Sequence, residues 1–289
     1  MTGKKMYVQF MGGLGNQMFQ YAFLKECQFR GMNIAADITW YERTKLNAVF
    51  ELDKVFPNIA LPIGKKKGIY LAMIPFYWKK IWKILWKKKS LPFEEKEDSR
   101  YEEEIFSVPS GILQGYWQSE KYFQNVKEEI RKSFQFQCED KGIQNILSEI
   151  KKEKHSVAVH IRRGDYMNAD NLYGNICTQA YYEKAIKQIK EVYPDAVFYF
   201  FSNDLAWVKE NYQGECYRYP DLSQCEHYEN WYDMYLMSQC ENNIIANSTF
   251  SWWAAWLNPN PKKIVLTPSK WLNGKETPDI WCDGWKKVI

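Results

Sequence analysis

The chain of 289 residues is long enough for two domains of ordinary size, and its 46% hydrophobic and 26% charged residues exclude a disordered protein. A net charge of +4 is too small to indicate a nucleic-acid partner without a focused basic patch, so none is expected. Seven cysteines with no C-x-x-C pair and no regular spacing argue against a disulfide framework or a zinc site and favour free thiols in a reducing compartment.

The first residues enter a predicted strand without the apolar stretch of a signal peptide. No run reaches the ~18 apolar residues that a membrane-spanning helix needs. We therefore expect a cytoplasmic protein. Aromatic residues make up 17% of the chain, which supplies flat side chains for stacking on sugars or bases, although core packing is the commoner use of such residues.

The first predicted unit is a strand, a glycine loop and a helix. Residues 6–11 read as a buried strand, GGLGN makes a tight loop, and residues 16–30 carry apolar side chains at helical spacing. Such a unit lets backbone amides and a helix N-terminus approach a phosphate, and it makes Gly13 and Gly15 binding candidates. It is not the dinucleotide fingerprint, because Met18 stands where the last glycine would be. A helix cap without a ligand is the alternative.

Residues 33–37 predict the next strand, and residues 65–89 form the most biased segment of the sequence. After Pro75 this segment predicts a basic amphipathic helix, with tryptophans on one arc and lysines on the other. Such a helix can lie peripherally on the inner face of the cell membrane, or it can cover a groove of its own protein. Both interpretations stay open. The acidic run at 94–104 predicts a solvated loop.

Residues 111–123 predict a short strand, a glycine turn and an aromatic cluster, and residues 126–134 predict a helix. The polar, lysine-rich stretch at 136–154 then separates two domains near residue 150, which gives domains of residues 1–150 and 151–289. A long connecting helix from 140 to 153 is equally consistent with this stretch.

From Ser156 onward, strands alternate regularly with helices. Thr178 is placed to cap the first of these helices. Strands alternating with helices predict a parallel, right-handed α/β sheet. The strands are predicted at 156–161, 197–201, 216–219, 243–246 and 264–267, and the later helices at 205–211, 232–239 and 250–257.

Polar residues follow three of these strands: Arg162-Arg163, then Ser202-Asn203-Asp204, then Asn247-Ser248-Thr249. In a parallel sheet the three strand ends lie at one edge, which is where ligands bind. Paired arginines suit a phosphate, a helix N-terminus leaves amides free for phosphate oxygens, and Asp204 can accept hydrogen bonds from guanine or ribose. The alternatives are an ion network that ties the arginines to carboxylates such as Asp165, ordinary caps and turns, and a chance adhesion tripeptide.

Three sequence blocks carry a family resemblance: GGLGNQMFQYAF at 12–23, HIRRGDY at 160–166 and NSTFSWWAAWLN at 247–258. They resemble the signature blocks of the bacterial α-1,2-fucosyltransferases of glycosyltransferase family 11. GYWQSEKYF at 115–123 and FFSND at 200–204 match too, so the resemblance touches nearly the whole length.

This resemblance implies a GT-B-like fold, in which two Rossmann-type α/β domains with mainly parallel sheets face each other across a cleft. It implies that residues 1–150 serve the acceptor side and that residues 151–289 bind the GDP-sugar. The implied reaction is the inverting transfer of L-fucose from GDP-fucose to the 2-hydroxyl of a terminal β-galactose on an oligosaccharide, without a metal or another cofactor. The sequence contains no D-x-D motif.

The implied catalytic residues are Arg162, Asn16 and either Asp165 or Asp170. Arg162 would stabilise the charge that develops on the β-phosphate, and a carboxylate would take the proton of the acceptor hydroxyl. Asp165 can instead brace Arg162, so the choice of base stays open. The resemblance implies that Asn16 lies near the reacting centre. The remaining binding candidates are Gly13, Gly15, Gln17, His160, Arg163, Asp204, Asn247, Ser248, Thr249 and Phe250.

Two further interpretations compete with fucosyl transfer. The same scaffold can use another GDP-sugar as its donor. Alternatively, the aromatic and lysine-rich surfaces can belong to a non-enzymatic protein that binds glycans or a membrane surface.

Overall fold

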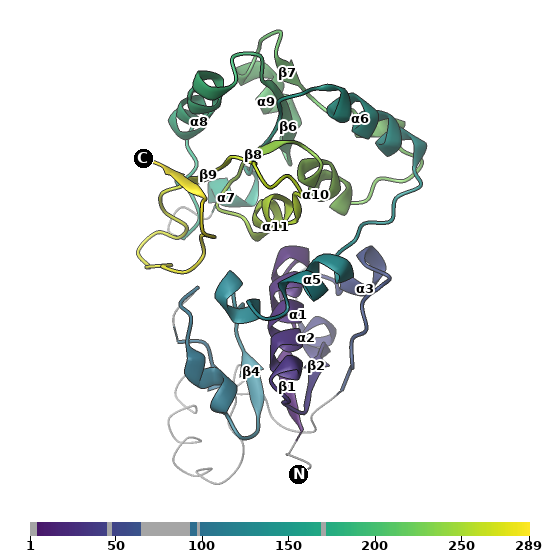
Figure 1. Ribbon diagram of the computed structural model, residues 1–289, viewed down its shortest axis with the longest axis vertical. Helices are drawn as coiled ribbons and strands as arrows, with labels where there is room; N and C mark the ends of the chain where they lie inside the picture. The colour runs from purple at the N-terminus through teal and green to yellow at the C-terminus, as the bar shows by residue number, and fades with distance from the viewer. Residues whose placement is uncertain (1–4, 45–47, 65–92, 97–98, 169–171) are drawn as a thin grey trace. The chain divides into compact units, whose positions relative to one another are not determined.

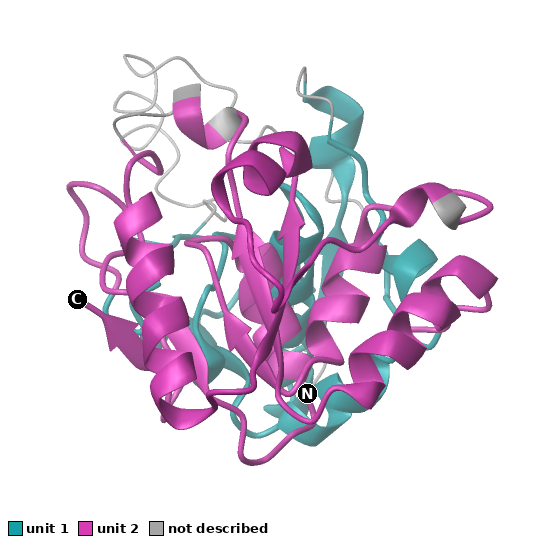
Figure 2. Cartoon of the chain, turned by 90° about the horizontal axis from the view of Figure 1, so that it is seen from above, with its two compact units in different colours: residues 1–135, 278–280 teal, residues 136–277, 281–289 magenta. Residues whose placement is uncertain are grey.

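The computed structural model describes residues 5–44, 48–64, 93–96, 99–168 and 172–289. The chain divides into two compact units, Met1–Gln135 with Pro278–Ile280 and Phe136–Thr277 with Trp281–Ile289 (Figure 2). This division falls before helix α6 (Lys141–Lys152), whereas the boundary suggested by the sequence, near residue 150, lies inside that helix. The buried residues of α6 explain the difference, because the helix packs on α10 of the second unit.

Among the described residues, the first unit contains a four-stranded, all-parallel sheet in the order β2-β1-β4-β3 (Figure 1). The strands are β1 (Met6–Gln9), β2 (Ile34–Asp37), β3 (Phe93–Glu94) and β4 (Ile112–Gln114). The helices are α1 (Leu14–Phe29), α2 (Thr39–Arg43), α3 (Leu52–Val55), α5 (Lys127–Ser133), and the 3₁₀ turns η2 (Glu103–Ser107) and η3 (Glu120–Phe123).

Helix α1 is the centre of this unit and is buried over most of its length. Phe23 is fully buried and stacks on Trp117, with ring centroids 4.3 Å apart. Burying a side chain of this size stabilises the fold by about 2–3 kcal/mol. The helix ends before Gly31, whose φ of +79° suits the left-handed turn that stops helices.

The second unit contains a six-stranded parallel sheet within the described chain, in the order β10-β9-β8-β5-β6-β7. The strands are β5 (Ser156–Ile161), β6 (Val197–Ser202), β7 (Tyr217–Arg218), β8 (Asn242–Ile244), β9 (Val265–Pro268) and β10 (Lys286–Val288). Besides α6, the helices are α7 (Asp165–Asn168), α8 (Gln179–Val192), α9 (Leu205–Asn211), α10 (Trp231–Ser238), α11 (Thr249–Leu257) and the 3₁₀ turn η4 (Leu222–Gln224).

Alternation along β5 separates two layers of helices. Val157, Val159 and Ile161 join the apolar cluster made with α8 and α9. The side chains between them, Ala158 and His160, therefore point to the opposite face, where α10 packs against β5 and α11 (Figure 1). The carboxyl ends of β8, β5 and β6 lie side by side, so the residues that follow these strands share one edge.

The predicted α/β class with two parallel-sheet units is confirmed, as is the order of strands and helices after residue 156. All seven cysteines, which lie in the described part of the chain, are free thiols, as predicted. No described helix is both long enough and apolar enough to cross a membrane. The amphipathic helix predicted at 65–89 lies outside the residues that the structure describes. Strand β10 was not predicted.

Candidate functional site

A cavity of about 220 Å³ opens at the carboxyl edge of the second sheet. It forms where the predicted polar residues come together, because β8, β5 and β6 are neighbours. Its lining includes Arg162, Arg163, Tyr166, Tyr173, Trp207 and Asn247. Two cations and several aromatic rings thus surround a hollow of the size of a base or a single sugar.

Arg163 is held in place by groups of its own unit. Its Nε donates to Asp204 Oδ2 at 3.1 Å, and its guanidinium lies 3.7 Å from the centroid of the Trp207 ring. Its backbone N–H donates to Asn203 Oδ1 at 2.9 Å. The turn needs a glycine next, since Gly164 has φ +54° and a Cβ there would meet Asn203 Nδ2 at 2.5 Å. The ion-network interpretation therefore holds for Arg163.

Asp204 corrects the sequence prediction, which assigned this carboxylate to the donor. One oxygen, Oδ1, caps α9 by accepting from the Trp207 N–H at 3.2 Å, and the other accepts from Arg163. Both oxygens already have internal partners, so Asp204 is less available to guanine than the sequence suggested, and its contact with the donor stays a prediction.

Arg162 and His160 are neighbours on β5 with different surroundings. Arg162 is half-buried, lines the cavity, and lies 5.5 Å from the centroid of the Tyr166 ring. His160 is 5% exposed, and burial together with the charge of Arg162 lowers its pKa to about 3, so the ring is neutral at physiological pH. Its Nδ1 has no hydrogen-bond partner within the described structure, and Phe250 packs against the ring with centroids 5.9 Å apart. His160 therefore offers a neutral, unsatisfied nitrogen beside Arg162.

Asn247 also differs from the prediction, because its side chain connects loops of the protein. Its Nδ2 donates to the carbonyls of Tyr173 and Trp271, each at 3.1 Å, and its Oδ1 accepts from the Cys177 thiol at 3.4 Å. Its own carbonyl accepts from the Tyr166 hydroxyl. These bonds leave no donor on Asn247 for a ligand, so its role is to hold the cavity wall.

Ser248 is the N-cap of α11, as predicted, but its hydroxyl makes no capping bond. Thr249 and Phe250 follow in the first turn and are half-buried. The N-terminal amides of a nine-residue helix thus lie at the carboxyl edge of β8, beside the arginines.

The glycine loop belongs to the first unit, at the carboxyl end of β1. Gly12 has φ +80°, Gly13 is the exposed N-cap of α1, and Gly15 is buried inside the helix. Asn16 lies in the first turn and is half-buried. Of the two glycines predicted to contact the donor, Gly13 is accessible, whereas Gly15 is buried.

Gln17 is a third correction. Its side chain is fully buried and makes four hydrogen bonds. Nε2 donates to the carbonyls of Gly12 and Val49, and Oε1 accepts from the amides of Glu51 and Leu52. Gln17 therefore joins the glycine loop to the segment before α3, and it has no capacity left for a substrate.

We expect Gln17→Leu to destabilise the protein by about 3–5 kcal/mol, because four backbone groups lose a partner and the side chain that joins them is fully buried. Urea unfolding measures this loss. Gln124→Leu is the control, since Gln124 is exposed, and its effect should stay within about 0.5 kcal/mol. A Gln17 variant of normal stability with an altered affinity for the donor would contradict the structural role.

The side chains of the two carboxylates proposed as the base lie outside the part of the chain that the structure describes. Asp170 lies outside the described residues, and so does the side chain of Asp165, whose backbone begins α7. The choice between them remains a prediction. Within the described residues, no three His, Cys, Asp or Glu side chains converge as metal ligands.

Asp233, which the sequence interpretation missed, lies in the first turn of α10. Helices between parallel strands run antiparallel to them, so this turn lies toward the carboxyl edge of the sheet. The helix packs against β5 and α11, on the His160 side. Burial raises the pKa of Asp233 to about 7. Leu236 and Met237, three and four residues further along the helix, are buried. An acidic residue on this apolar helix face was the sequence signal that could have identified Asp233.

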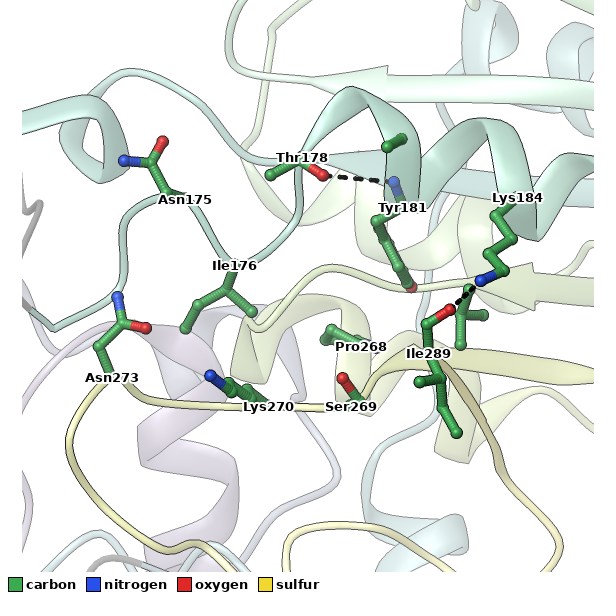
Figure 3. Close-up of a pocket in the computed structure, with 12 residues that line it drawn as sticks. Asn175, Ile176, Thr178, Tyr181, Lys184, Pro268, Ser269, Lys270, Asn273 and Ile289 are labelled. Carbon is green, nitrogen blue, oxygen red and sulfur yellow. Dashed lines mark hydrogen bonds between the residues drawn. The ribbon is translucent and has the colours of Figure 1, made fainter.

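A second cavity of about 320 Å³ adjoins the first and shares Asn175 and Thr178 with it (Figure 3). Thr178 caps α8, as predicted, by accepting from the Tyr181 N–H at 3.4 Å. On the far side, Lys184 donates to the carbonyl of Ile289. The carboxyl edge of this sheet therefore carries two neighbouring hollows.

Comparison with known proteins identifies the family. The model described as glycosyl transferase family 11 matches residues 2–288. An alpha-1,2-colitosyltransferase of Escherichia coli is 36% identical over 92% of this chain and 91% of its own length. Human galactoside alpha-(1,2)-fucosyltransferase 1 is 29% identical over 50% of this chain and 42% of its own.

Two further comparisons cover most of this chain. The O-antigen biosynthesis glycosyltransferase WbnK of Escherichia coli is 32% identical over 97% of this chain and 99% of its own. Among solved structures, a variant of Arabidopsis thaliana FUT1 in complex with GDP aligns over 92% of this chain and 71% of its own, with 12% identity and a TM-score of 0.49. The match over residues 2–288 and the 36% identity leave one assignment: the chain is a glycosyltransferase and belongs to glycosyltransferase family 11.

Proposed function

We propose that this glycosyltransferase transfers L-fucose from GDP-fucose, with inversion, to the 2-hydroxyl of a terminal β-galactose. The observation that carries the proposal is the cavity at the carboxyl edge of the second sheet, which is lined by half-buried Arg162 and by Asn247, two residues before α11. The names of the colitosyl and fucosyl relatives, which share an alpha-1,2 linkage, support the regiochemistry.

Arg162 is the main catalytic residue in this proposal. Breaking the sugar–phosphate bond leaves negative charge on the β-phosphate, and a guanidinium can meet two of its oxygens at once. The amides at the start of α11 can meet the others. Arg163 and Asp204 act indirectly, since their bond fixes the turn from which Arg162 projects.

The nucleoside is proposed to lie against the α10 and α11 layer. His160 is neutral, so it contributes a hydrogen bond and not a charge. Asp233 replaces Asp204 as the candidate for guanine, because a carboxylate can accept from both N1–H and the N2 amine of that base. Its partial burial strengthens such bonds.

A divalent metal is not required in this scheme, because Arg162 and the helix N-terminus neutralise the leaving group. The base that accepts the galactose proton is Asp165 or Asp170, as proposed from the sequence.

A second donor deserves a direct comparison. Colitose is L-fucose without its 3-hydroxyl group, and the Escherichia coli relative of 36% identity is named for colitosyl transfer. We expect the purified protein to release GDP from GDP-fucose when a β-galactoside is present, and excess EDTA to leave the rate within about twofold, since metal-assisted catalysis would lose far more.

Assays with GDP-fucose, GDP-colitose and GDP-mannose measure kcat/KM for each donor, and NMR of the product reports the linkage. A strong preference for GDP-colitose would replace the proposed donor. Loss of activity in EDTA that returns with Mg²⁺ would overturn the metal-free mechanism.

A further inference from the structure

At the carboxyl edge of the first unit's sheet, a side-chain hydrogen bond joins the first turn of α1 to the segment after β4. Asn16 follows β1 in the glycine loop, and Gln118 follows β4, the neighbouring strand. Gln118 Nε2 donates to Asn16 Oδ1 at 2.9 Å. Both side chains are half-buried, so the pair lies at the surface of the loops rather than in the core.

The direction of this bond decides what Asn16 can offer. Because Oδ1 accepts from Gln118, the amide is turned so that Nδ2 and its two hydrogens lie on the other side. Nδ2 lies over Gly12, where a Cβ would approach it to 2.5 Å. The left-handed glycine therefore makes room for the amide nitrogen, and the glycine loop presents hydrogen-bond donors next to exposed Gly13.

We propose that Gln118 is a positioning residue that holds Asn16 as a hydrogen-bond donor toward an oxygen of the sugar nucleotide. The inference rests on the proposed function and concerns one atom of it: Asn16 acts through Nδ2. An amide is not a general base, and Gln118 already occupies one of the two lone pairs of Oδ1 in this orientation. Gln118 belongs to the GYWQSEKYF block, to which the reaction scheme gave no role.

Gln118→Glu tests the orientation directly. A carboxylate only accepts hydrogen bonds, so Asn16 must turn its Nδ2 toward position 118 and present Oδ1 to the substrate. We expect kcat with GDP-fucose to fall about tenfold to 10²-fold, with the midpoint of thermal unfolding nearly unchanged. Asn16→Asp removes the same donor and keeps an acceptor for Gln118, so it should lose at least as much.

The matched control is Gln124→Glu, the same change at an exposed position of the same unit, and it should retain wild-type kinetics. KM values for donor and acceptor, measured separately, identify the substrate that Asn16 meets. An effect confined to the acceptor KM would overturn the assignment to the sugar nucleotide.

A double-mutant comparison of Gln118 and Asn16 distinguishes a positioning role of Gln118 from a general effect on stability. If Gln118 acts only through Asn16, Gln118→Glu should cost nothing further in an Asn16→Ala background, whereas independent structural roles would multiply the losses. Should the charged variant fail to fold, Gln118→Leu provides the same comparison. Wild-type rates in Gln118→Glu, or multiplied losses in the double variant, overturn the inference. Absence of transfer by the wild-type protein would instead overturn the proposed function.

Discussion

Replacing Arg162 by lysine should lower kcat/KM with GDP-fucose about 10²–10³-fold, the usual cost of losing a group that stabilises charge in the transition state. A lysine keeps the positive charge but cannot contact two phosphate oxygens through one planar group. The loss should fall mainly on kcat, because the charge on the β-phosphate grows as the sugar leaves. Steady-state kinetics with separate variation of donor and acceptor measures it.

Two comparisons sharpen this test. Arg218→Lys alters an exposed arginine of the same unit and should leave the rate unchanged. Arg163→Lys should lower the free energy of unfolding and should change kcat much less than the Arg162 variant does. It weakens the bond to Asp204 and the stacking on Trp207. Guanidinium ions added to Arg162→Ala should restore part of the rate. Equal kinetic losses in the Arg162 and Arg163 variants would contradict the division of roles between them.

Regular alternation made most of the fold predictable. From β5 to β9 mainly apolar strands alternate with helices, most of which carry apolar residues at helical spacing, so element order and parallel topology followed from the pattern. Strand β10 was not predicted because Lys286 and Lys287 precede Val288 in a stretch without alternation of apolar and polar residues. Only its pairing with β9 makes it a strand.

The candidate site was predictable as a location and less so in its details. The three polar strand ends do meet, because β8, β5 and β6 are neighbours. Sequence alone could not separate residues that face a ligand from those that bind the backbone. The amides of Gln17 and Asn247 are suited to either use, and their partners lie as far as 74 residues away. Asp233 was missed because it lies inside an apolar helical pattern.

Asp233→Asn should make the protein more stable above pH 7 while weakening its donor binding. Burial raises the pKa of the folded carboxyl to about 7 from an ordinary value of 3.8, so the group keeps its proton where the unfolded chain has lost it. Unfolding therefore releases a proton between about pH 4 and 7, and wild-type stability falls as pH rises through this window. An uncharged amide of the same shape escapes that loss and should gain about 2–4 kcal/mol at pH 8 in urea unfolding.

Binding should change in the opposite direction. An amide presents one acceptor where the ionised carboxylate presents two, so the Kd for GDP should rise about tenfold or more. Wild-type protein should bind GDP more tightly at pH 8 than at pH 5.5 and should prefer GDP to IDP, which lacks the N2 amine. The variant should lose both preferences. Calorimetric titration measures these affinities for both proteins, with Glu229→Gln, a change at an exposed acid of the same unit, as the control. A variant that gains stability yet still discriminates GDP from IDP would show that Asp233 does not contact the base.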